Sequence, residues 1–195
     1  MTTKYLALSA MVAALIGAPT LQAADIRGPD ALAGTCAGCH GTNGYSVGDT
    51  MPSIAGLNKR YLMKTMEDFK SDVRPSTIMG RIARGYSDQD LETIAAFFAG
   101  QKWQAAPQKV DAKKAEAGAK LHEEACASCH GKDGSYNEKE TPRLAGQWLR
   151  YTYMQLVDLH DIERPTADPY EMHKRIEKLS KEEIDALSNY YASVK

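Results

Sequence analysis

The sequence predicts an all-α protein built from two homologous units in tandem. The segment CAGCH at residues 36–40 returns 90 positions later as CASCH at residues 126–130, and a long repeat of this kind indicates a duplicated structural unit. Each copy ends in a stretch whose apolar residues recur at helical spacing. No segment has the alternating pattern of a convincing strand. We therefore expect both units to be helical.

Residues 1–24 have the order of parts found in a secretory signal peptide. Lys4 precedes an apolar run over residues 5–18, and small residues follow the run. A membrane-spanning helix needs about 20 apolar residues, whereas this run is shorter and ends at Pro19. We expect cleavage of this segment, a mature chain that begins near Asp25, and export to the periplasm.

Three main helices are expected at matching places in the two units. The first helix leads into the cysteines and starts at Pro29 in one unit and near Ala112 in the other. The middle helices are predicted over residues 58–70 and 147–160. The terminal helices begin at capping boxes, in which a serine precedes an acidic residue by three positions. These pairs are Ser87 with Asp90 and Ser180 with Glu183.

The register of the repeat predicts the domain organisation. The shift of 90 holds from the cysteines to Pro75 and Pro165, and it then becomes 93, because the second copy has three additional residues before its terminal helix. Pro107 and neighbouring small and polar residues interrupt the helical pattern between the copies. We therefore expect one domain over residues 25–104 and another over residues 105–195.

The repeated Cys-x-x-Cys-His segment is the attachment signature of a c-type haem. Its two thiols form thioethers with the haem, and the adjacent imidazole binds the iron. A four-cysteine zinc site has a much shorter interval than that between Cys39 and Cys126, a thioredoxin-like dithiol needs a βαβ setting, and disulfides do not require the histidines. We expect two haems, one held by Cys36 and Cys39 and one held by Cys126 and Cys129.

A covalently attached haem also solves a packing problem. Units of about 80 residues with a few short helices keep much of their surface in water and bury little apolar area unaided. A haem in the middle of each unit supplies the missing core. The expected fold class is therefore all-α, with two tandem class I cytochrome c domains, each wrapped around one covalently attached haem.

The axial ligands of the two irons are predicted from the repeat. His40 and His130 complete the two motifs and are the expected first ligands. A second ligand should have an equivalent in the other copy, and Met79 pairs with Met172 under the shift of 93. The methionines that lack a methionine opposite them are Met51, Met63 and Met66. We expect Met79 and Met172 to be ligands, each in an irregular segment between a proline and the terminal helix.

The remaining methionines and histidines are expected to have supporting roles. The methionines expected to fill gaps in the core are Met63, Met66 and Met154. Three histidines have no histidine opposite them in the first unit, and these are His122, His160 and His173. We expect these histidines to be solvated or to support a ligand rather than to bind iron.

Two interpretations are open for several polar residues near the expected sites. Tyr61, Tyr151 and Trp148 either reach haem propionates with their polar tips or pack with one edge in water. Arg74 and Arg164 either pair with a propionate or end a solvated helix.

One-electron transfer is the expected function. An iron held by histidine and methionine has both axial positions filled, so a substrate cannot bind without displacing the sulfur. The chain is therefore expected not to be an enzyme, and a di-haem peroxidase, which needs an open iron, is disfavoured. A formal net charge of −1, from 24 Lys and Arg against 25 Asp and Glu, leaves no basic surplus for nucleic acid.

The segment from Glu67 to Ser87, with RPSTIMGRIARGYS at residues 74–87, resembles the first haem domain of the di-haem cytochrome subunit of flavocytochrome c sulfide dehydrogenase. The segments AKLH at 119–122 and LAGQW at 144–148 are also similar to that subunit, and we expect the match to cover essentially the whole mature chain. The resemblance implies a heterodimer with an FAD-containing flavoprotein that oxidises sulfide. The haems would then pass electrons singly to a soluble or membrane-bound acceptor.

A second resemblance supports an alternative function. The Pro-x-x-Ala-Gly element, present at residues 52–56 and 142–146, and the segment from Asp168 to Ser180 are similar to freestanding periplasmic di-haem carriers that supply terminal oxidases. The first ligand segment favours the sulfide dehydrogenase subunit, whereas the second favours the carriers. The freestanding carrier is therefore kept as the alternative.

Overall fold

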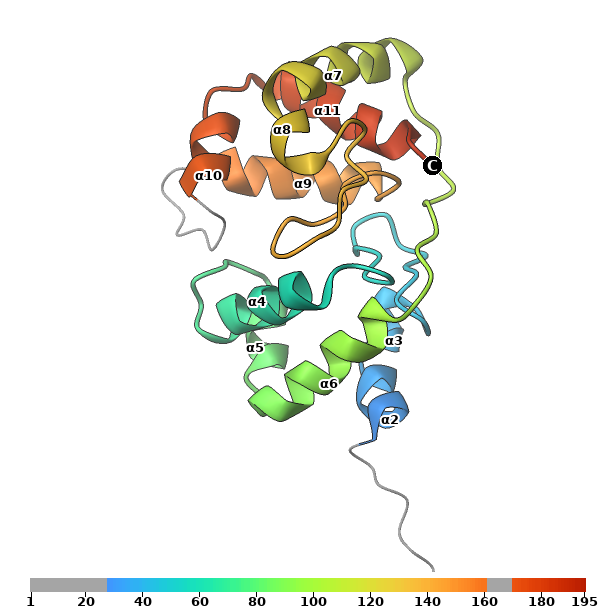
Figure 1. Ribbon diagram of the computed structural model, residues 1–195, viewed down its shortest axis with the longest axis vertical. Coiled ribbons are helices and arrows are strands. Elements are labelled where there is room, and N and C mark those ends of the chain that lie inside the picture. The colour runs from blue at the N-terminus through green and yellow to red at the C-terminus, as the bar shows by residue number, and fades with distance from the viewer. Residues whose placement is uncertain (1–27, 161–169) are drawn as a thin grey trace, which may run out of the picture.

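The structure is a computed structural model that describes residues 28–160 and 170–195. Its helices form two lobes, with α2 to α6 in one and α7 to α11 in the other (Figure 1). Within the described ranges, extended pairing is limited to one isolated bridge between Glu138 and Thr141. The predicted all-α class is confirmed. The expected signal peptide and Arg164 lie outside the described residues.

The helices of the first domain are α2 (Pro29–Gly34), α3 (Ala37–His40), α4 (Lys59–Lys70), α5 (Met79–Ala83) and α6 (Asp88–Ala99). The helices of the second domain are α7 (Ala112–Ala125), α8 (Ala127–His130), α9 (Leu149–His160), α10 (Tyr170–Ile176) and α11 (Lys181–Ser193). The helices predicted before the cysteines, in the middle of each unit and at its end are therefore all present.

Capping boxes determine where the two terminal helices begin. Ser87 is the N-cap of α6, and its hydroxyl accepts a hydrogen bond from the Asp90 amide, while the Asp90 carboxylate accepts from the Ser87 amide. Ser180 and Glu183 make the same reciprocal pair at α11. Each box satisfies backbone N–H groups that have no partner within the helix. Both predicted capping boxes are confirmed.

Each domain has its own apolar core beneath its terminal helix. In the first domain, Ile94 and Phe98 of α6 are buried where α6 packs on α2 and α4. In the second, Ile184, Leu187 and Tyr191 of α11 are buried where α11 packs on α7 and α9. The helical spacing of apolar residues expected at the end of each copy thus gives each terminal helix a buried face.

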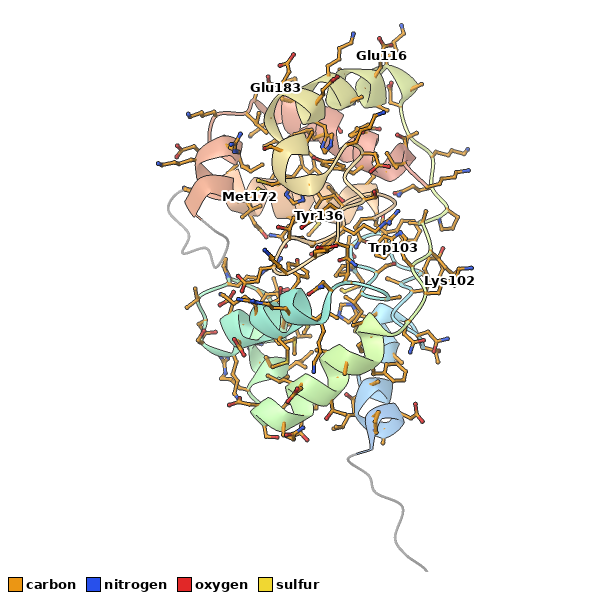
Figure 2. All side chains as sticks on the ribbon, in the orientation of Figure 1. Lys102, Trp103, Glu116, Tyr136, Met172 and Glu183 are labelled. Carbon is orange, nitrogen blue, oxygen red and sulfur yellow. The ribbon has the colours of Figure 1, made fainter. Side chains whose placement is uncertain are left out.

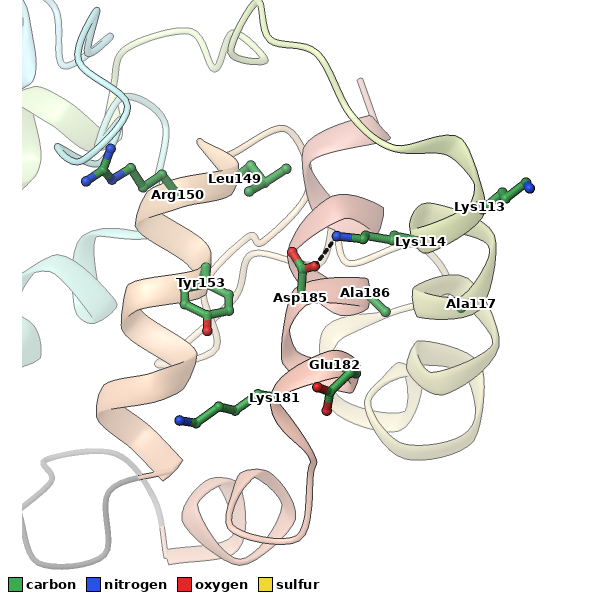
Figure 3. Close-up of a pocket in the computed structure, with 10 residues that line it drawn as sticks. All are labelled: Lys113, Lys114, Ala117, Leu149, Arg150, Tyr153, Lys181, Glu182, Asp185 and Ala186. Atoms are coloured by element: carbon green, nitrogen blue, oxygen red, sulfur yellow. Dashed lines mark hydrogen bonds and ion pairs between the residues drawn. The ribbon is translucent and has the colours of Figure 1, made fainter.

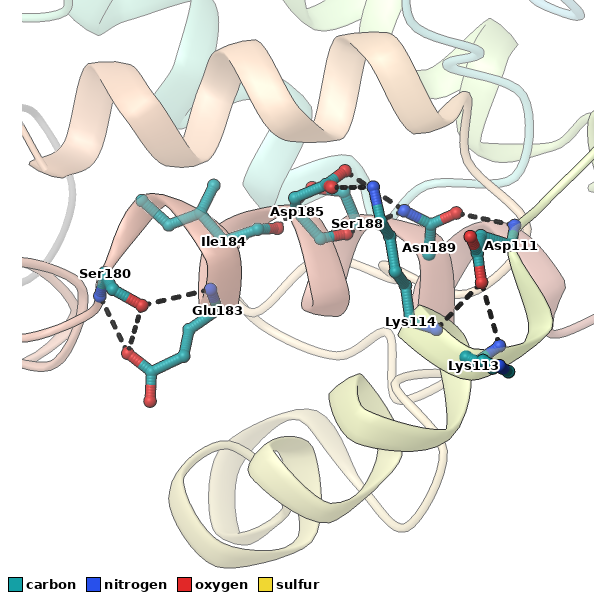
Figure 4. A network of polar contacts seen from close by, with 9 residues as sticks. All are labelled: Asp111, Lys113, Lys114, Ser180, Glu183, Ile184, Asp185, Ser188 and Asn189. Carbon is teal, nitrogen blue, oxygen red and sulfur yellow. Dashed lines mark hydrogen bonds and ion pairs between the residues drawn. The ribbon is translucent and has the colours of Figure 1, made fainter.

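Polar contacts attach the N-terminal end of α7 to the neighbouring helix α11 (Figure 4). The Asp111 carboxylate caps α7 by accepting hydrogen bonds from the amides of Lys113 and Lys114. The Asp111 amide donates to the Asn189 side chain over 2.9 Å, and Lys114 forms an ion pair with Asp185. The first and last helices of the second domain are thereby held together at one end.

The segments that carry Met79 and Met172 differ from the prediction. We expected irregular chain, whereas Met79 begins α5 and Met172 lies in α10. The Ser76 hydroxyl accepts a hydrogen bond from the Gly80 amide over 2.8 Å, which satisfies one of the free donors at the start of α5. Helices of five and seven residues are too short to produce a recognisable apolar period in the sequence.

The linker between the domains is extended but attached to the second domain. Ala106 donates its amide proton to the Gly146 carbonyl over 2.8 Å, and the Gln108 side chain bonds to the backbone of Gln147 and Leu149. The boundary predicted between residues 104 and 105 lies in this linker and stays a prediction. Among the described helices, none is long and apolar enough to cross a membrane.

Gly118 allows the close approach of α7 to α11. A Cβ atom at this position would lie 2.1 Å from the backbone oxygen of Ala186, far inside the van der Waals limit. Because the obstacle is backbone, it cannot rotate away as a flexible side chain could.

We therefore expect Gly118→Ala to destabilise the protein. Alanine favours a helix over glycine by about 1 kcal/mol, but forcing the two helices apart costs roughly 1–3 kcal/mol and also disturbs the contacts around α11. Denaturant unfolding of the haem-loaded protein measures the difference. Gly34→Ala in α2 is the matched control, because its Cβ would meet no atom within 4 Å. A Gly118 variant as stable as the Gly34 variant would contradict this explanation.

Candidate haem-binding sites

A one-turn helix presents the two cysteines and the histidine of each motif. In α3, the amides of Cys39 and His40 both donate to the carbonyl of Cys36, over 3.2 and 2.9 Å. The same pattern holds in α8, where Cys126 accepts from Cys129 and His130. Both motifs therefore form the compact turn that the attachment of a haem to two neighbouring thiols requires.

All four cysteines are free thiols, and each motif has one inner and one outer cysteine. Cys36 and Cys126 are half-buried, whereas Cys39 and Cys129 are exposed. Burial raises the pKa of Cys36 and of Cys126, so both are held as neutral thiols. Each pair is therefore placed on one turn with both thiols available for thioether bonds.

The two motif histidines are buried and oriented by backbone carbonyls. His40 is 8% exposed and donates its Nδ1 proton to the Pro52 carbonyl over 2.9 Å, and His130 is 5% exposed and donates to Pro142 over 3.3 Å. Burial lowers the pKa of both imidazoles, which favours the neutral form that binds a metal. Because Nδ1 carries the proton, Nε2 has a free lone pair, and each imidazole is suited to bind iron through that atom.

The repeated Pro-x-x-Ala-Gly element closes a loop around each histidine. The Gly44 carbonyl accepts hydrogen bonds from Ile54 and Ala55, while the Gly56 amide donates to Phe98 in α6. Equivalent bonds occur in the second domain. Gly56 has φ of 66°, a conformation that only glycine adopts without strain. The element therefore shapes the loop beside each motif histidine, and the acceptor role of its proline carbonyls was missed by the sequence analysis.

The two candidate methionine ligands are half-buried in their domains. Met172 packs against the apolar core of the second domain, and Figure 2 labels it on α10. Met63 packs against the first core, as predicted for a gap-filling residue. Met154 is 45% exposed, so its predicted place in the core is wrong, because it lies on the solvent face of α9.

His122 is fully buried beneath the second motif and is not solvated. Its Nε2 atom lies 2.8 Å from the Gly131 carbonyl and its Nδ1 atom lies 3.0 Å from the Tyr191 hydroxyl. Since the carbonyl can only accept, Nε2 donates and Nδ1 accepts the tyrosine proton. The solvated role left open for this histidine is therefore wrong, while support of an iron ligand stays a prediction.

His173 also has a structural contact of this kind, because its Nδ1 atom lies 2.8 Å from the Leu159 carbonyl. It therefore ties α10 to the end of α9.

The polar residues with two open interpretations contact protein groups. Trp148 is buried and donates its indole proton to the Ser46 carbonyl in the other domain. Arg74 is 7% exposed, and its guanidinium donates to Thr65 and, across the interface, to Gln155. The solvated helix end considered for Arg74 is therefore wrong, because the interface buries it.

An open groove of about 900 Å³ lies on the second domain between α7, α9 and α11 (Figure 3). None of the motif cysteines, motif histidines or candidate methionines lines it. Its walls carry Lys113, Lys114, Arg150 and Lys181 together with Glu182 and Asp185. Lys114 is paired with Asp185, and we assign no role to the groove.

Two separate helical domains, each with a pair of free thiols and a buried neutral imidazole on one turn, define a di-haem c-type cytochrome. The cytochrome c family matches residues 26–102 and 115–195, and the chain belongs to this family. Each domain binds one covalent haem through its cysteine pair, and the chain is an electron-transfer protein.

Cytochromes c4 are among the relatives whose match spans both domains. The chain is 35% identical over 185 residues to cytochrome c4 of Azotobacter vinelandii, covering 86% of this chain and 88% of that protein. The structure also resembles the crystal structure of reduced recombinant cytochrome c4 from Pseudomonas stutzeri. In that comparison the TM-score is 0.79 and the identity 31%, with 89% of this chain and 100% of the other covered.

The expected similarity to a sulfide dehydrogenase subunit is present over a shorter length. The cytochrome subunit of sulfide dehydrogenase from Chlorobaculum tepidum is 45% identical over 64 residues, which covers 33% of this chain and 57% of that protein. We expected this match to span essentially the whole mature chain, whereas it covers a third.

Tyr191 and His122 form a buried polar pair that the first domain lacks, since Phe98 and Leu32 occupy the equivalent positions. We expect Tyr191→Phe to leave Nδ1 of His122 without a partner and to cost about 1–3 kcal/mol of unfolding free energy. The double variant His122→Leu with Tyr191→Phe restores an apolar pair and should lose less than the sum of the single variants.

Denaturant unfolding of the haem-loaded protein measures each of these changes. Tyr190→Phe is the control, because Tyr190 lies beside the pair in the same helix and is only half-buried. Strict additivity in the double variant would contradict a shared hydrogen bond.

Proposed function

We propose that this chain is a freestanding electron carrier that moves single electrons between exported redox proteins. The observation that carries the proposal is the similarity to cytochrome c4, which extends over both domains in sequence and structure. The match to the sulfide dehydrogenase subunit is limited to a third of the chain. The signal-like segment at residues 1–24 supports a periplasmic location.

In this proposal, His40 with Met79 and His130 with Met172 are the axial ligands, and the cysteine pairs hold the haems. The haems supply the one-electron chemistry. The chain contributes by orienting each imidazole through a proline carbonyl and by placing each methionine on a short helix, with Met172 against the apolar core of its domain. Because both axial positions are taken by protein atoms, the site passes electrons and does not bind a substrate.

The second candidate function is that of electron-accepting subunit in a flavocytochrome c sulfide dehydrogenase. It is supported by the 45% identity over 64 residues to the Chlorobaculum tepidum subunit. In that case an FAD-containing flavoprotein would form a heterodimer with this chain. We would expect contact on the first domain near residues 67–87, where the resemblance is strongest.

The ligand assignment predicts separate effects for the two methionines. Met79→Ala and Met172→Ala should each abolish the sulfur-to-iron absorption of one haem and lower the reduction potential of that haem, because thioether ligation raises it. Visible spectroscopy during a redox titration measures both properties. Met154→Ala is the control, since Met154 is exposed and should leave both haems unchanged. Retention of two methionine-ligated haems in either ligand variant would show that the assignment is wrong.

The two candidate functions predict different behaviour in the native host. A freestanding carrier should elute alone when purified without denaturant, and the reduced protein should pass electrons rapidly to a membrane oxidase. Co-elution with a flavin-containing chain, together with haem reduction by sulfide only in the presence of that chain, would favour the dehydrogenase subunit instead.

A further inference from the structure

The interface between the domains contains a buried glutamine that binds both polar groups of one backbone residue. Gln147 of the second domain is 5% exposed. Its Nε2 donates to the Ser53 carbonyl over 2.9 Å, and its Oε1 accepts from the Ser53 amide over 2.9 Å. Ser53 is 1% exposed, so water does not compete strongly for these bonds.

The Ser53 amide belongs to the same peptide unit as the Pro52 carbonyl. That carbonyl accepts the Nδ1 proton of His40 over 2.9 Å. A peptide group whose N–H donates a hydrogen bond becomes a stronger acceptor at its own oxygen, because hydrogen bonds in a chain polarise one another. A continuous path therefore runs from Gln147 through the Pro52–Ser53 peptide to the imidazole of His40.

The second domain lacks the reciprocal arrangement. Under the repeat shift of 90, Leu57 occupies the position of Gln147, and its side chain has no hydrogen-bonding group. The bond from His130 to Pro142 is also longer, at 3.3 Å. The polarising contact therefore acts on the histidine of the first domain alone.

We propose that Gln147 is a positioning residue that strengthens the hydrogen bond of His40 from across the domain interface and thereby lowers the reduction potential of the first haem. A stronger bond at Nδ1 makes the imidazole a more basic ligand, and a more basic ligand stabilises the oxidised iron. The effect favours electron flow from the first haem to the second. The inference rests on His40 as an iron ligand, and it holds for either candidate function.

The test uses the protein loaded with both haems. Gln147→Met keeps a side chain of similar length but removes the amide group. Gln147→Leu introduces the leucine that the first domain has at the equivalent position. We expect both variants to raise the potential of the first haem and to leave that of the second unchanged. A redox titration followed by proton NMR, which resolves the signals of the two haems, measures the potentials separately.

Asn137→Leu is the matched control variant. Asn137 also bridges the domains through both ends of its amide, donating to the Gly56 carbonyl over 2.7 Å and accepting from the Asn58 amide over 3.0 Å. It does not contact the Pro52–Ser53 peptide. The control should leave the first potential unchanged, although it removes the same number of bonds from the interface.

Three results would overturn the proposal. These are unchanged potentials in both Gln147 variants, equal shifts at both haems, or a shift in Asn137→Leu as large as that in the Gln147 variants. Failure of the ligand assignment is recognised separately, because NMR of the unchanged protein would then lack an iron-shifted imidazole signal from His40.

Discussion

The hydrogen bond from the motif histidine to a proline carbonyl twelve residues later is the interaction on which each domain depends. It fixes the protonated nitrogen of His40 and His130, and so determines which nitrogen can bind iron. It also joins the one-turn helix that carries the cysteines to the loop that carries Pro-x-x-Ala-Gly. That loop is in turn bonded to the terminal helix through Gly56 and Gly146. Cofactor site, loop and core are thus one connected unit in each domain.

The same loops form the interface between the domains, which connects the two sites to each other. Trp148 donates to Ser46, Gln147 binds Ser53, and the Tyr151 amide donates to the Asp49 carbonyl. Nearly all of these bonds join a side chain to a backbone group, or two backbone groups. Surface ion pairs at the interface, such as Arg60 with Glu140, contribute little because both partners are solvated. The geometry of the loops, rather than charge, therefore determines how the domains meet.

The repeat made much of this structure predictable, because duplicated residues indicate shared structural roles. The helices before the cysteines, in the middle of each unit and at its end, and the capping boxes, depend on local sequence and were predicted. The helices at Met79 and Met172 were missed because they are too short for periodicity to indicate. Burial of Arg74 and the role of Gln147 could not be predicted, since they depend on contacts with residues far away in sequence. Met154 was misplaced because an apolar side chain on a helix can remain in water.

Divergence between the copies gives the two sites different surroundings on the same scaffold. The first domain has Leu32 and Phe98 where the second has His122 and Tyr191, so only the second motif rests on a buried polar pair. The first receives Gln147 from its neighbour, whereas Leu57, the residue at the equivalent position, lies in the core of its own domain. Haem potentials respond to hydrogen bonding and burial around the ligands, and both differ here. Duplication thus supplies two equivalent haem folds, while these substitutions make the surroundings of the two haem sites unequal.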